Sequence, residues 1–151
     1  MANKSIANDS GASFSVWMHT RVPAYKQELP ATSEADVCII GAGIAGMTTA
    51  YLLGQQGKRV VVIDDGPIGG GETSRTTAHL ASAQDDRFTF LERYHGTAGT
   101  KLAAESHAAA IDRIEFICAR EAIDCDFQRV DGYLFNPPGG DPKFLQQECK
   151  A

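Results

Sequence analysis

Three apolar segments in the first half of the chain have the spacing of a strand, a helix and a second strand. Residues 37–40 and 60–63 are short runs of mostly β-branched apolar residues, which are typical of buried strands. Between them, apolar residues recur at helical spacing over residues 44–56, and Gly57 stands where a helix commonly ends. The pattern predicts one βαβ unit.

A second set of patterns follows. Apolar residues lie along one face of a predicted helix over residues 102–122, where we expect core packing. This face consists of Ala103, Ala110, Ile111, Ile114, Ile117 and Cys118. Residues 126–130 and 133–136 are strand-like and are joined by Asp131-Gly132, which predicts a β-hairpin because both turn residues can adopt positive φ.

The last predicted element is a helix. Asp141 and Pro142 are residue types favoured at the N-cap and at the first helical position, so the helix should start at Lys143. It reaches Ala151 without a glycine or another stop signal. We therefore expect the chain to stop inside an element.

The whole chain divides into three predicted parts. Residues 1–34 form an N-terminal arm, which is partly disordered because its first part is polar and has no periodic pattern. Residues 35–95 form the region around the βαβ unit. Residues 96–151 contain the long helix, the hairpin and the final helix.

Composition excludes several classes of protein. The 151 residues and 16.2 kDa suit one ordinary domain. The net charge of −5 and the absence of a Lys/Arg block argue against nucleic-acid binding. No apolar run approaches the roughly 18 residues of a membrane helix, and no signal-peptide pattern begins the chain. The default expectation is a cytoplasmic protein without a membrane partner, of unknown oligomeric state.

The four cysteines, Cys38, Cys118, Cys125 and Cys149, form no C-x-x-C motif and have no histidine at metal-ligand spacing. We therefore expect no metal site, reduced thiols and no cysteine nucleophile. Cys38 lies in the first predicted strand and Cys118 on the apolar helix face, where a free thiol usually packs as a small hydrophobic group.

The turn after the first strand is Gly41-Ala42-Gly43-Ile44-Ala45-Gly46, the G-x-G-x-x-G pattern. Gly41 permits a tight turn, Gly43 leaves the backbone bare for a pyrophosphate, and Gly46 lets the helix pack close to the strands. Free N–H groups and the positive end of the helix dipole then face the anion. The pattern is weak by itself, but its position between strand and helix predicts a Rossmann-like dinucleotide site in an α/β fold.

Asp64 follows the second strand, about 20 residues after the glycines, where a carboxylate accepts hydrogen bonds from the ribose of an adenine dinucleotide. With Asp65 beside it, Asp64 should also repel the 2′-phosphate of NADP. The alternative is a strand-end carboxylate that contacts only solvent. The glycine turn favours the ribose role.

The stretch after Asp64 is too glycine-rich for a simple connection. Three consecutive glycines at 69–71 are followed by Glu72 and then by the hydroxyl-rich residues 73–77, with Arg75 among them. A flexible backbone leading to a helix start with hydroxyl donors and a guanidinium suits a second contact with the same cofactor. The alternative is a mobile surface loop.

Together, ADVCIIGAGIAGMTTAYLLGQQGKRVVVID at 35–64 and GPIGGGETSRTTAH at 66–79 resemble the N-terminus of FAD-dependent oxidoreductases of the glycine/D-amino-acid oxidase family. They are most similar to the branch whose full-length members carry a Rieske iron–sulfur domain at the C-terminus. The resemblance extends from Trp17 onward. No Rieske C-x-H and C-x-x-H pair occurs in the sequence.

The resemblance implies an FAD site. The glycines would hold the pyrophosphate, Asp64 the adenosine ribose, and residues 73–77 the diphosphate, ribityl or isoalloxazine side. The full set of expected cofactor-binding residues is Gly41, Gly43, Ile44, Ala45, Gly46, Asp64, Asp65, Gly71, Thr73, Ser74, Arg75, Thr76 and Thr77. His79 is expected to be a neighbour of the flavin rather than its point of covalent attachment.

The resemblance also implies oxidation of a C–N bond in an amine or amino acid, with residues 96–151 opening a mixed α+β substrate domain. It assigns no catalytic residues in this chain. We expect an incomplete FAD-binding unit, the N-terminal part of a larger enzyme, which turns over no substrate alone. Two alternatives remain: an NAD-binding enzyme or regulatory module, since the same glycine pattern serves NAD, and a non-catalytic truncated fragment.

Overall fold

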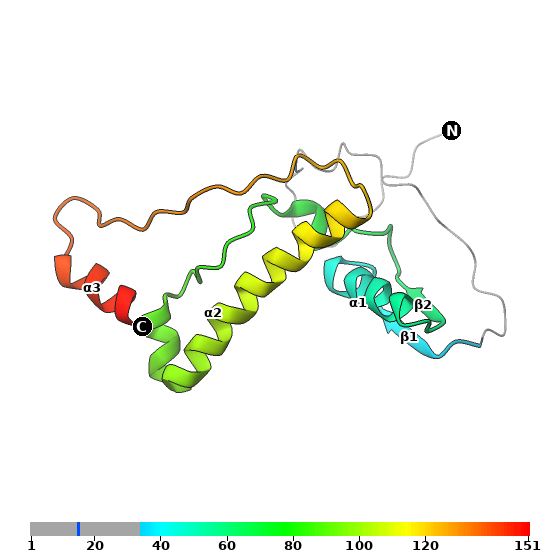
Figure 1. Cartoon of the computed structure of the whole chain (residues 1–151), viewed down its shortest axis with the longest axis horizontal. Coiled ribbons are helices and arrows are strands. Elements are labelled where there is room, and N and C mark those ends of the chain that lie inside the picture. Colours follow the sequence, from blue (N-terminus) through cyan, green and yellow to red (C-terminus); the bar gives the residue numbers. More distant parts are fainter. Residues whose placement is uncertain (1–14, 16–33) are drawn as a thin grey trace. The chain divides into compact units, whose positions relative to one another are not determined.

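The computed structural model describes residue 15 and residues 34–151. The arm predicted for residues 1–34 therefore lies almost entirely outside the described residues. The chain divides into two compact units, one reaching Ala78 and one starting at His79, and each is described by itself (Figure 1).

The first unit contains the predicted βαβ arrangement. Strand β1 (Val37–Ile40) is followed by helix α1 (Ile44–Gln55) and strand β2 (Val60–Ile63). The strands are parallel, with Val37 opposite Val60 and Ile40 opposite Ile63, and α1 packs against both of them (Figure 1). The prediction of strand, helix and strand from the apolar pattern is confirmed.

Local signals set the limits of these elements. At the end of α1, Gly57 has φ of +77°. The N–H of Gly57 donates to the carbonyl of Gly54 at 2.9 Å, and the N–H of Lys58 to that of Leu53 at 3.1 Å. This is the Schellman arrangement, so the glycine predicted to end the helix does so. The strand pair is also held at its start, where Asp36 forms an ion pair of 3.1 Å with Arg59.

The glycine-rich stretch after β2 forms one short element, the 3₁₀ helix η2 (Glu72–Arg75). The chain turns before it, with Gly69 at φ +67° and the N–H of Gly70 donating to the carbonyl of Pro67 at 2.8 Å. The expected helix start is therefore a single 3₁₀ turn. Residues 76–87, which follow, form neither helix nor strand.

The second unit is dominated by helix α2 (Phe88–Arg120). It begins well before the predicted limit of residue 102, and Gly96 interrupts it with φ 67° and ψ 170°. The prediction did not include the first segment, although Phe88, Leu91 and Tyr94 recur there at helical spacing. Only the part after Gly96 contains the periodic face on which the prediction rested.

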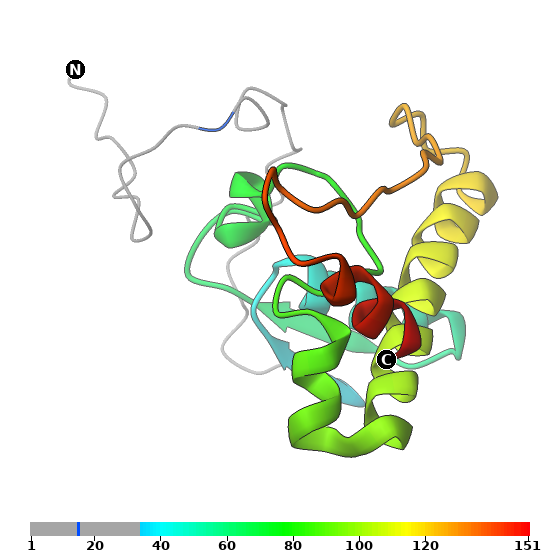
Figure 2. The ribbon, with the colours of Figure 1, turned by 90° about the vertical axis from the view of Figure 1, so that its left-hand side faces the viewer.

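Helix α3 (Pro142–Lys150) packs against the start of α2 (Figure 2). Its N-terminus is as predicted, because the Asp141 carboxylate accepts from the N–H of Lys143 at 2.9 Å and Pro142 is the first helical residue. From within α3, Glu148 accepts from the N–H of Phe88 at 2.6 Å and from that of Thr89 at 3.1 Å. One helix thus caps the other, which the sequence pattern did not indicate.

The hairpin predicted for residues 126–136 is wrong, because no strand forms there. The side chains of Tyr133 and Phe135 are 83% and 77% exposed, so neither a third strand nor a helix covers the segment. A two-stranded hairpin alone is marginal in water. Asp126, with φ +53°, also breaks the extended path of the first run.

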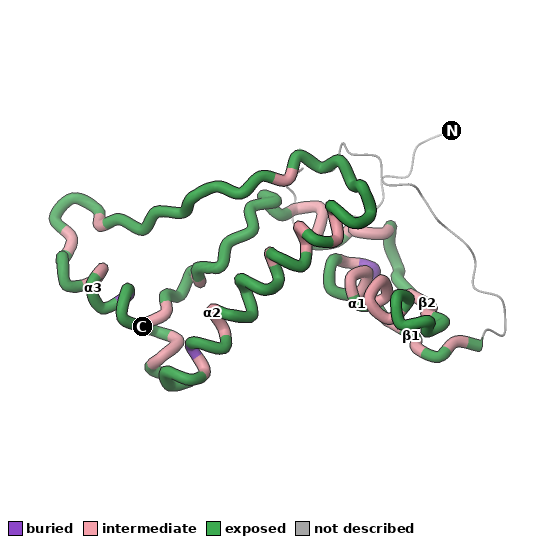
Figure 3. The backbone as a smooth tube through the Cα atoms, in the orientation of Figure 1, coloured by how far each residue is buried: buried purple, intermediate pink, exposed green. Residues whose placement is uncertain are grey.

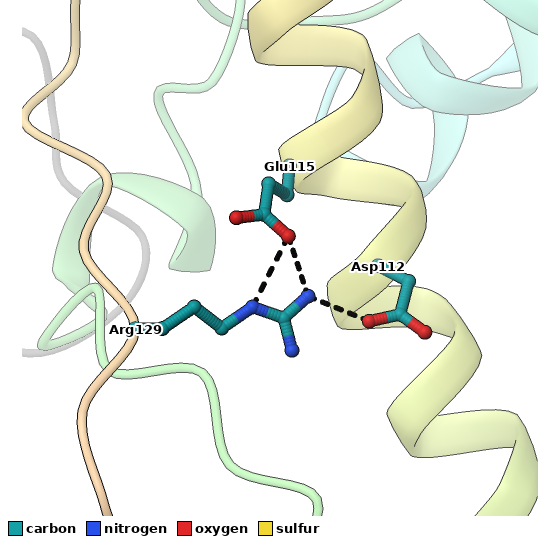
Figure 4. A network of polar contacts seen from close by, with 3 residues as sticks. All are labelled: Asp112, Glu115 and Arg129. Carbon is teal, nitrogen blue, oxygen red and sulfur yellow. Dashed lines mark hydrogen bonds and ion pairs between the residues drawn. The ribbon is translucent and has the colours of Figure 1, made fainter.

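Arg129 holds this segment against α2 (Figure 4). Its guanidinium lies 2.6 Å from Asp112 and 2.6 Å from Glu115, both on α2. These two carboxylates raise the pKa of Arg129, mainly through the hydrogen bonds that they accept from its guanidinium, those accepted by Glu115 foremost. All three side chains are exposed, so these ion pairs contribute little to the stability of the fold. Their main effect is to hold the segment around Arg129 beside α2.

Burial is sparse in both units (Figure 3). Among the described residues, Ala42 is the one buried hydrophobic residue, and Thr100 and Glu148 are the buried polar ones. The α2 face predicted to pack in a core is only half-buried, and Ala110 is exposed. Cys38 is exposed on β1 rather than packed as a small hydrophobic group, because side chains of a strand alternate and this face has no cover.

Candidate functional site

The glycine turn leaves β1 through a backbone conformation that favours glycine. Gly41 has φ of +103°, and its N–H donates to the carbonyl of Ile63 on β2 at 2.8 Å. The next residue, Ala42, is buried, and its carbonyl accepts from the N–H of Gly69 at 2.9 Å. The two glycine-rich stretches of the sequence therefore lie against each other.

The N-terminus of α1 presents backbone donors. Gly43 is the N-cap residue, with φ −77° and ψ −173°, and it has no side chain to cap the helix. Within residues 34–151, the N–H groups of Gly43, Ala45 and Gly46 donate no hydrogen bond. These N–H groups, together with the positive end of the helix dipole, are the usual features of an anion site.

Gly46 allows the close approach that its motif position predicts. A Cβ atom at Gly46 would collide with the carbonyl of Gly41 and lie 3.3 Å from Cγ2 of Ile39 on β1. A side chain there would force α1 away from the strand. Glycine is therefore a requirement of packing at this position, independently of any ligand.

Asp64 is tied to the turn. Its Oδ2 accepts from the N–H of Ala42 at 2.5 Å, and its Oδ1 from the N–H of Gly66 at 2.7 Å. These two backbone hydrogen bonds, the one from Ala42 foremost, lower the pKa of Asp64. The carboxylate is exposed and ionised at neutral pH, and it lies where the two glycine-rich stretches meet.

Thr73 brings the second stretch to the start of the helix. Its Oγ1 accepts from the N–H of Ile44 at 3.0 Å. The same oxygen would lie 3.2 Å from a Cβ atom built on Gly43. The predicted residues Gly43, Ile44 and Thr73 are thus brought together by the structure.

The remaining predicted residues are less tightly placed. The Ser74 hydroxyl donates to the carbonyls of Gly70 and Gly71, at 3.3 and 2.9 Å, which stabilises η2 itself. Arg75 is half-buried at the end of η2. Within residues 34–151, Asp65, Gly71, Thr76 and Thr77 form no hydrogen bond to the glycine turn, and all four are exposed.

Two structural roles in the site were not predicted from the sequence. Asp64 was predicted to bind the ribose, and its role in the turn was not, although an Asp followed two residues later by Gly66 is a known turn signal. Thr73 was predicted to lie at the site only because it follows the glycine-rich stretch, and no local pattern pairs it with Ile44. The second contact joins residues far apart in the chain, so spacing rules cannot reveal it.

The part of the chain that the structure describes holds neither a cluster of metal ligands nor a membrane-spanning helix. No group of three or more His, Cys, Asp or Glu side chains is placed to hold a metal ion. No helix there has the length and apolar character needed to cross a membrane.

A glycine turn between a parallel strand and a helix, with a carboxylate after the next strand, is the arrangement found in dinucleotide-binding proteins. Residues 36–150 match the model of the DAO family, described as FAD dependent oxidoreductase. The chain belongs to this family.

Three relatives show the range of the family around this chain. YhfW of Bacillus subtilis (strain 168), named as a Rieske 2Fe-2S iron-sulfur protein, is 35% identical over 136 residues, which are 89% of this chain and 26% of YhfW. The gamma-glutamylputrescine oxidoreductase of Escherichia coli (strain K12) is 27% identical over 93 residues, 62% of this chain and 22% of that protein. The similarity to YhfW supports the resemblance to the branch of the family whose full-length members carry a Rieske domain.

The third relative is the tRNA 5-methylaminomethyl-2-thiouridine biosynthesis bifunctional protein MnmC of Ralstonia nicotianae. It is 35% identical over 105 residues, 66% of this chain and 15% of that protein. The chain thus spans about a quarter or less of the length of these relatives. No solved structure matches it.

Proposed function

We propose that this chain forms the adenine-nucleotide part of the FAD site of a flavin-dependent oxidoreductase that oxidises C–N bonds in amines or amino acids. The observation that carries the proposal is the open row of N–H groups at Gly43, Ala45 and Gly46, with the Asp64 carboxylate fixed to the same turn. The row suits a pyrophosphate, and the carboxylate suits a ribose.

The residues fit the chemistry of this ligand. An ionised carboxylate has about four lone-pair sites, and the two N–H groups that Asp64 accepts use only two of them. The others are available for the ribose hydroxyls, with Asp65 beside them. We call the space between the backbone of Gly43 and the side chain of Thr73 the cradle. Gly43 puts no side chain into it, and a Cβ atom there would lie 3.2 Å from the Thr73 hydroxyl. In the proposal, the pyrophosphate approaches this bare backbone.

Thr73 supplies a further donor to the same cradle. Its oxygen accepts from the N–H of Ile44, and a hydroxyl keeps its own proton to donate elsewhere. In the proposal this proton is donated to a diphosphate oxygen. In the proposal, the ribityl chain and the flavin ring are contacted by the neighbouring residues Gly71, Ser74, Arg75, Thr76 and Thr77. Residues 35–95 form the cofactor-binding region, and residues 96–151 open the substrate domain.

A bound flavin would supply the redox chemistry, which is acceptance of a hydride from the substrate carbon that bears nitrogen. The residues of this chain bind and orient that cofactor. The choice of a C–N bond rests on the family and on the names of two relatives, which refer to a gamma-glutamylputrescine and to a methylaminomethyl group. Because one fold hosts many reactions, this part of the proposal needs its own test.

The cofactor is tested by titrating the purified chain with FAD and following flavin fluorescence and visible absorbance. NAD and NADP are then added as competitors, with circular dichroism as the control for folding. We expect FAD to bind, NAD to displace it poorly and NADP not at all, because Asp64 repels a 2′-phosphate. Stronger binding of NAD or NADP, or a folded chain that binds no nucleotide, contradicts the proposal.

The reaction is tested on a chain of the relatives' length that contains this sequence, since residues 1–151 span about a quarter or less of those relatives. The flavin-loaded protein is mixed anaerobically with amines, amino acids and, as a control, 2-hydroxy acids. Bleaching of the flavin by the nitrogen compounds supports C–N oxidation. Bleaching by the hydroxy acids alone contradicts it.

A further inference from the structure

Two cysteines outside the cofactor site lie in contact at the end of α2. The Sγ atoms of Cys118 and Cys125 are 3.6 Å apart. Both thiols are free, Cys118 half-buried in the last turns of the helix and Cys125 exposed in the segment that follows. A disulfide joins sulfur atoms at about 2.05 Å, so small side-chain rotations bring this pair to bonding distance.

The local backbone produces this contact. The N–H of Ile123 donates to the carbonyl of Cys118 at 2.9 Å, and that of Ala122 to Ala119 at 3.3 Å. With Ala122 at φ +51°, this is a Schellman turn that uses alanine where glycine is usual. The turn reverses the chain and returns Cys125 to the helix face that carries Cys118.

A second tether acts further along the same segment. Arg129 pairs with Asp112 and Glu115 of α2, each at 2.6 Å (Figure 4). The segment is therefore held along the helix on both sides of Cys125, by the turn before it and the ion pairs after it. This arrangement keeps the two thiols together.

We propose that Cys118 and Cys125 are a redox modification site, which a low-molecular-weight disulfide such as oxidised glutathione converts to an intramolecular disulfide. The disulfide would link the end of α2 covalently to the segment after it. No part of the proposed cofactor site takes part in the step.

The exchange balances in two steps. The exposed Cys125, as thiolate, attacks one sulfur of oxidised glutathione and releases one glutathione thiolate. Cys118 then loses its proton to solvent, attacks the Cys125 sulfur and expels the second glutathione. Two electrons pass from the cysteine pair to oxidised glutathione, which becomes two molecules of glutathione. Burial and the neighbouring Cys125 thiol raise the pKa of Cys118, which suits Cys118 to the second attack rather than the first.

The test equilibrates the full chain at mildly alkaline pH with a series of ratios of reduced to oxidised glutathione. After quenching in acid and alkylation, trypsin cleaves at Arg120 between the two cysteines. The disulfide then appears in mass spectrometry as peptide 114–120 linked to peptide 121–129. We expect this linked pair to form with an equilibrium constant about tenfold or more above that of the same chain in concentrated urea, because the fold holds the thiols together.

Cysteine variants test whether the disulfide belongs to the pair Cys118 and Cys125. A chain with Cys38→Ser and Cys149→Ser should keep the same equilibrium constant, whereas Cys118→Ser should leave only a glutathione adduct on Cys125. Absence of the linked pair at every ratio overturns the proposal. Equal constants in buffer and in urea also overturn it, as does preferred pairing of Cys125 with Cys38 or Cys149.

Discussion

The Oδ2 atom of Asp64 accepts a hydrogen bond of 2.5 Å from the backbone N–H of Ala42, which links the end of β2 to the glycine turn after β1. The same carboxylate accepts from Gly66 at 2.7 Å. Asp64 therefore shapes the turn before any ligand arrives, and it still has lone pairs for a ribose. In the proposed site, one side chain positions the cradle and binds the ligand.

This dual role predicts that Asp64→Ala weakens FAD binding more than Asp65→Ala. Removal of Asp64 leaves two backbone donors without their acceptor and takes away the ribose partner, so we expect an affinity loss of roughly tenfold to a hundredfold. Asp65 makes no hydrogen bond among the described residues, so its removal should have a smaller effect. Flavin fluorescence titration of the two variants decides between them, and equal losses contradict the assignment.

The pH dependence follows from the same hydrogen bonds. The pKa of Asp64 is lowered by the N–H groups of Ala42 and Gly66. The contribution of the ionised Asp64 to the turn and to FAD binding is therefore complete above the ordinary pKa of an aspartate. It is lost as the pH falls through the lower pKa of the folded chain. FAD affinity of the parent chain should decline only in that acidic range, and the part of the decline due to Asp64 should be absent in Asp64→Ala.

Thr73 provides a second test of the turn. Thr73→Val keeps the shape of the side chain but removes the acceptor for the N–H of Ile44 and the proton proposed for the diphosphate. We expect FAD affinity to fall by roughly tenfold. Thr73→Ser retains the hydroxyl and should bind FAD nearly as the parent does. If isothermal titration finds the Val and Ser variants equal, the hydroxyl has no role in binding.

Glu148 is expected to stabilise the second unit. Burial acts to raise its pKa, but hydrogen bonds from Phe88 and Thr89 outweigh burial, and the pKa is lowered. Glu148→Ala removes the cap of α2, so the free energy of unfolding should fall by about 1–2 kcal/mol at neutral pH. Because the pKa is lowered, this contribution is complete above the ordinary pKa of glutamate and is lost as the pH falls through the folded value.

The matched control for Glu148 is Glu105→Ala. Glu105 is exposed on the same helix α2 and, among residues 34–151, pairs only with Lys101 at 3.8 Å. Such surface pairs contribute only about 0.3–0.5 kcal/mol. Urea unfolding followed by circular dichroism compares the two, and a cost for Glu105→Ala as large as that for Glu148→Ala would refute the capping role.

The sequence predicted the elements whose signals are local. Strands β1 and β2, the turn at Gly41 and the end of α1 at Gly57 each depend on a few neighbouring residues, and each was found as expected. Asp141 and Pro142 predicted the start of α3 for the same reason. The spacing of apolar residues and the positions of glycines are enough to predict strands, turns and helix ends of this kind.

Contacts between distant residues were not predictable in this way. Thr73 and Ile44 are 29 positions apart, and Glu148 and Phe88 are 60 apart. The hairpin failed for a related reason, since Asp131-Gly132 is a good turn sequence but a strand pair also needs a covered face. The chemistry of the site was read from residues close in sequence, whereas the contacts that fix it came only from the structure.

The central claim, that the turn at Gly43 is the FAD pyrophosphate site, is tested most directly by the FAD affinity of Gly43→Val beside that of Gly54→Ala. A side chain at Gly43 enters the cradle beside Thr73 in a backbone conformation that valine can adopt. A Cβ atom at Gly54 meets nothing within 4 Å on the surface of the same helix. We predict that Gly43→Val loses at least about tenfold in FAD affinity with its circular dichroism unchanged, while Gly54→Ala binds as the parent does. Binding of FAD by Gly43→Val as tight as that of the parent would contradict the account.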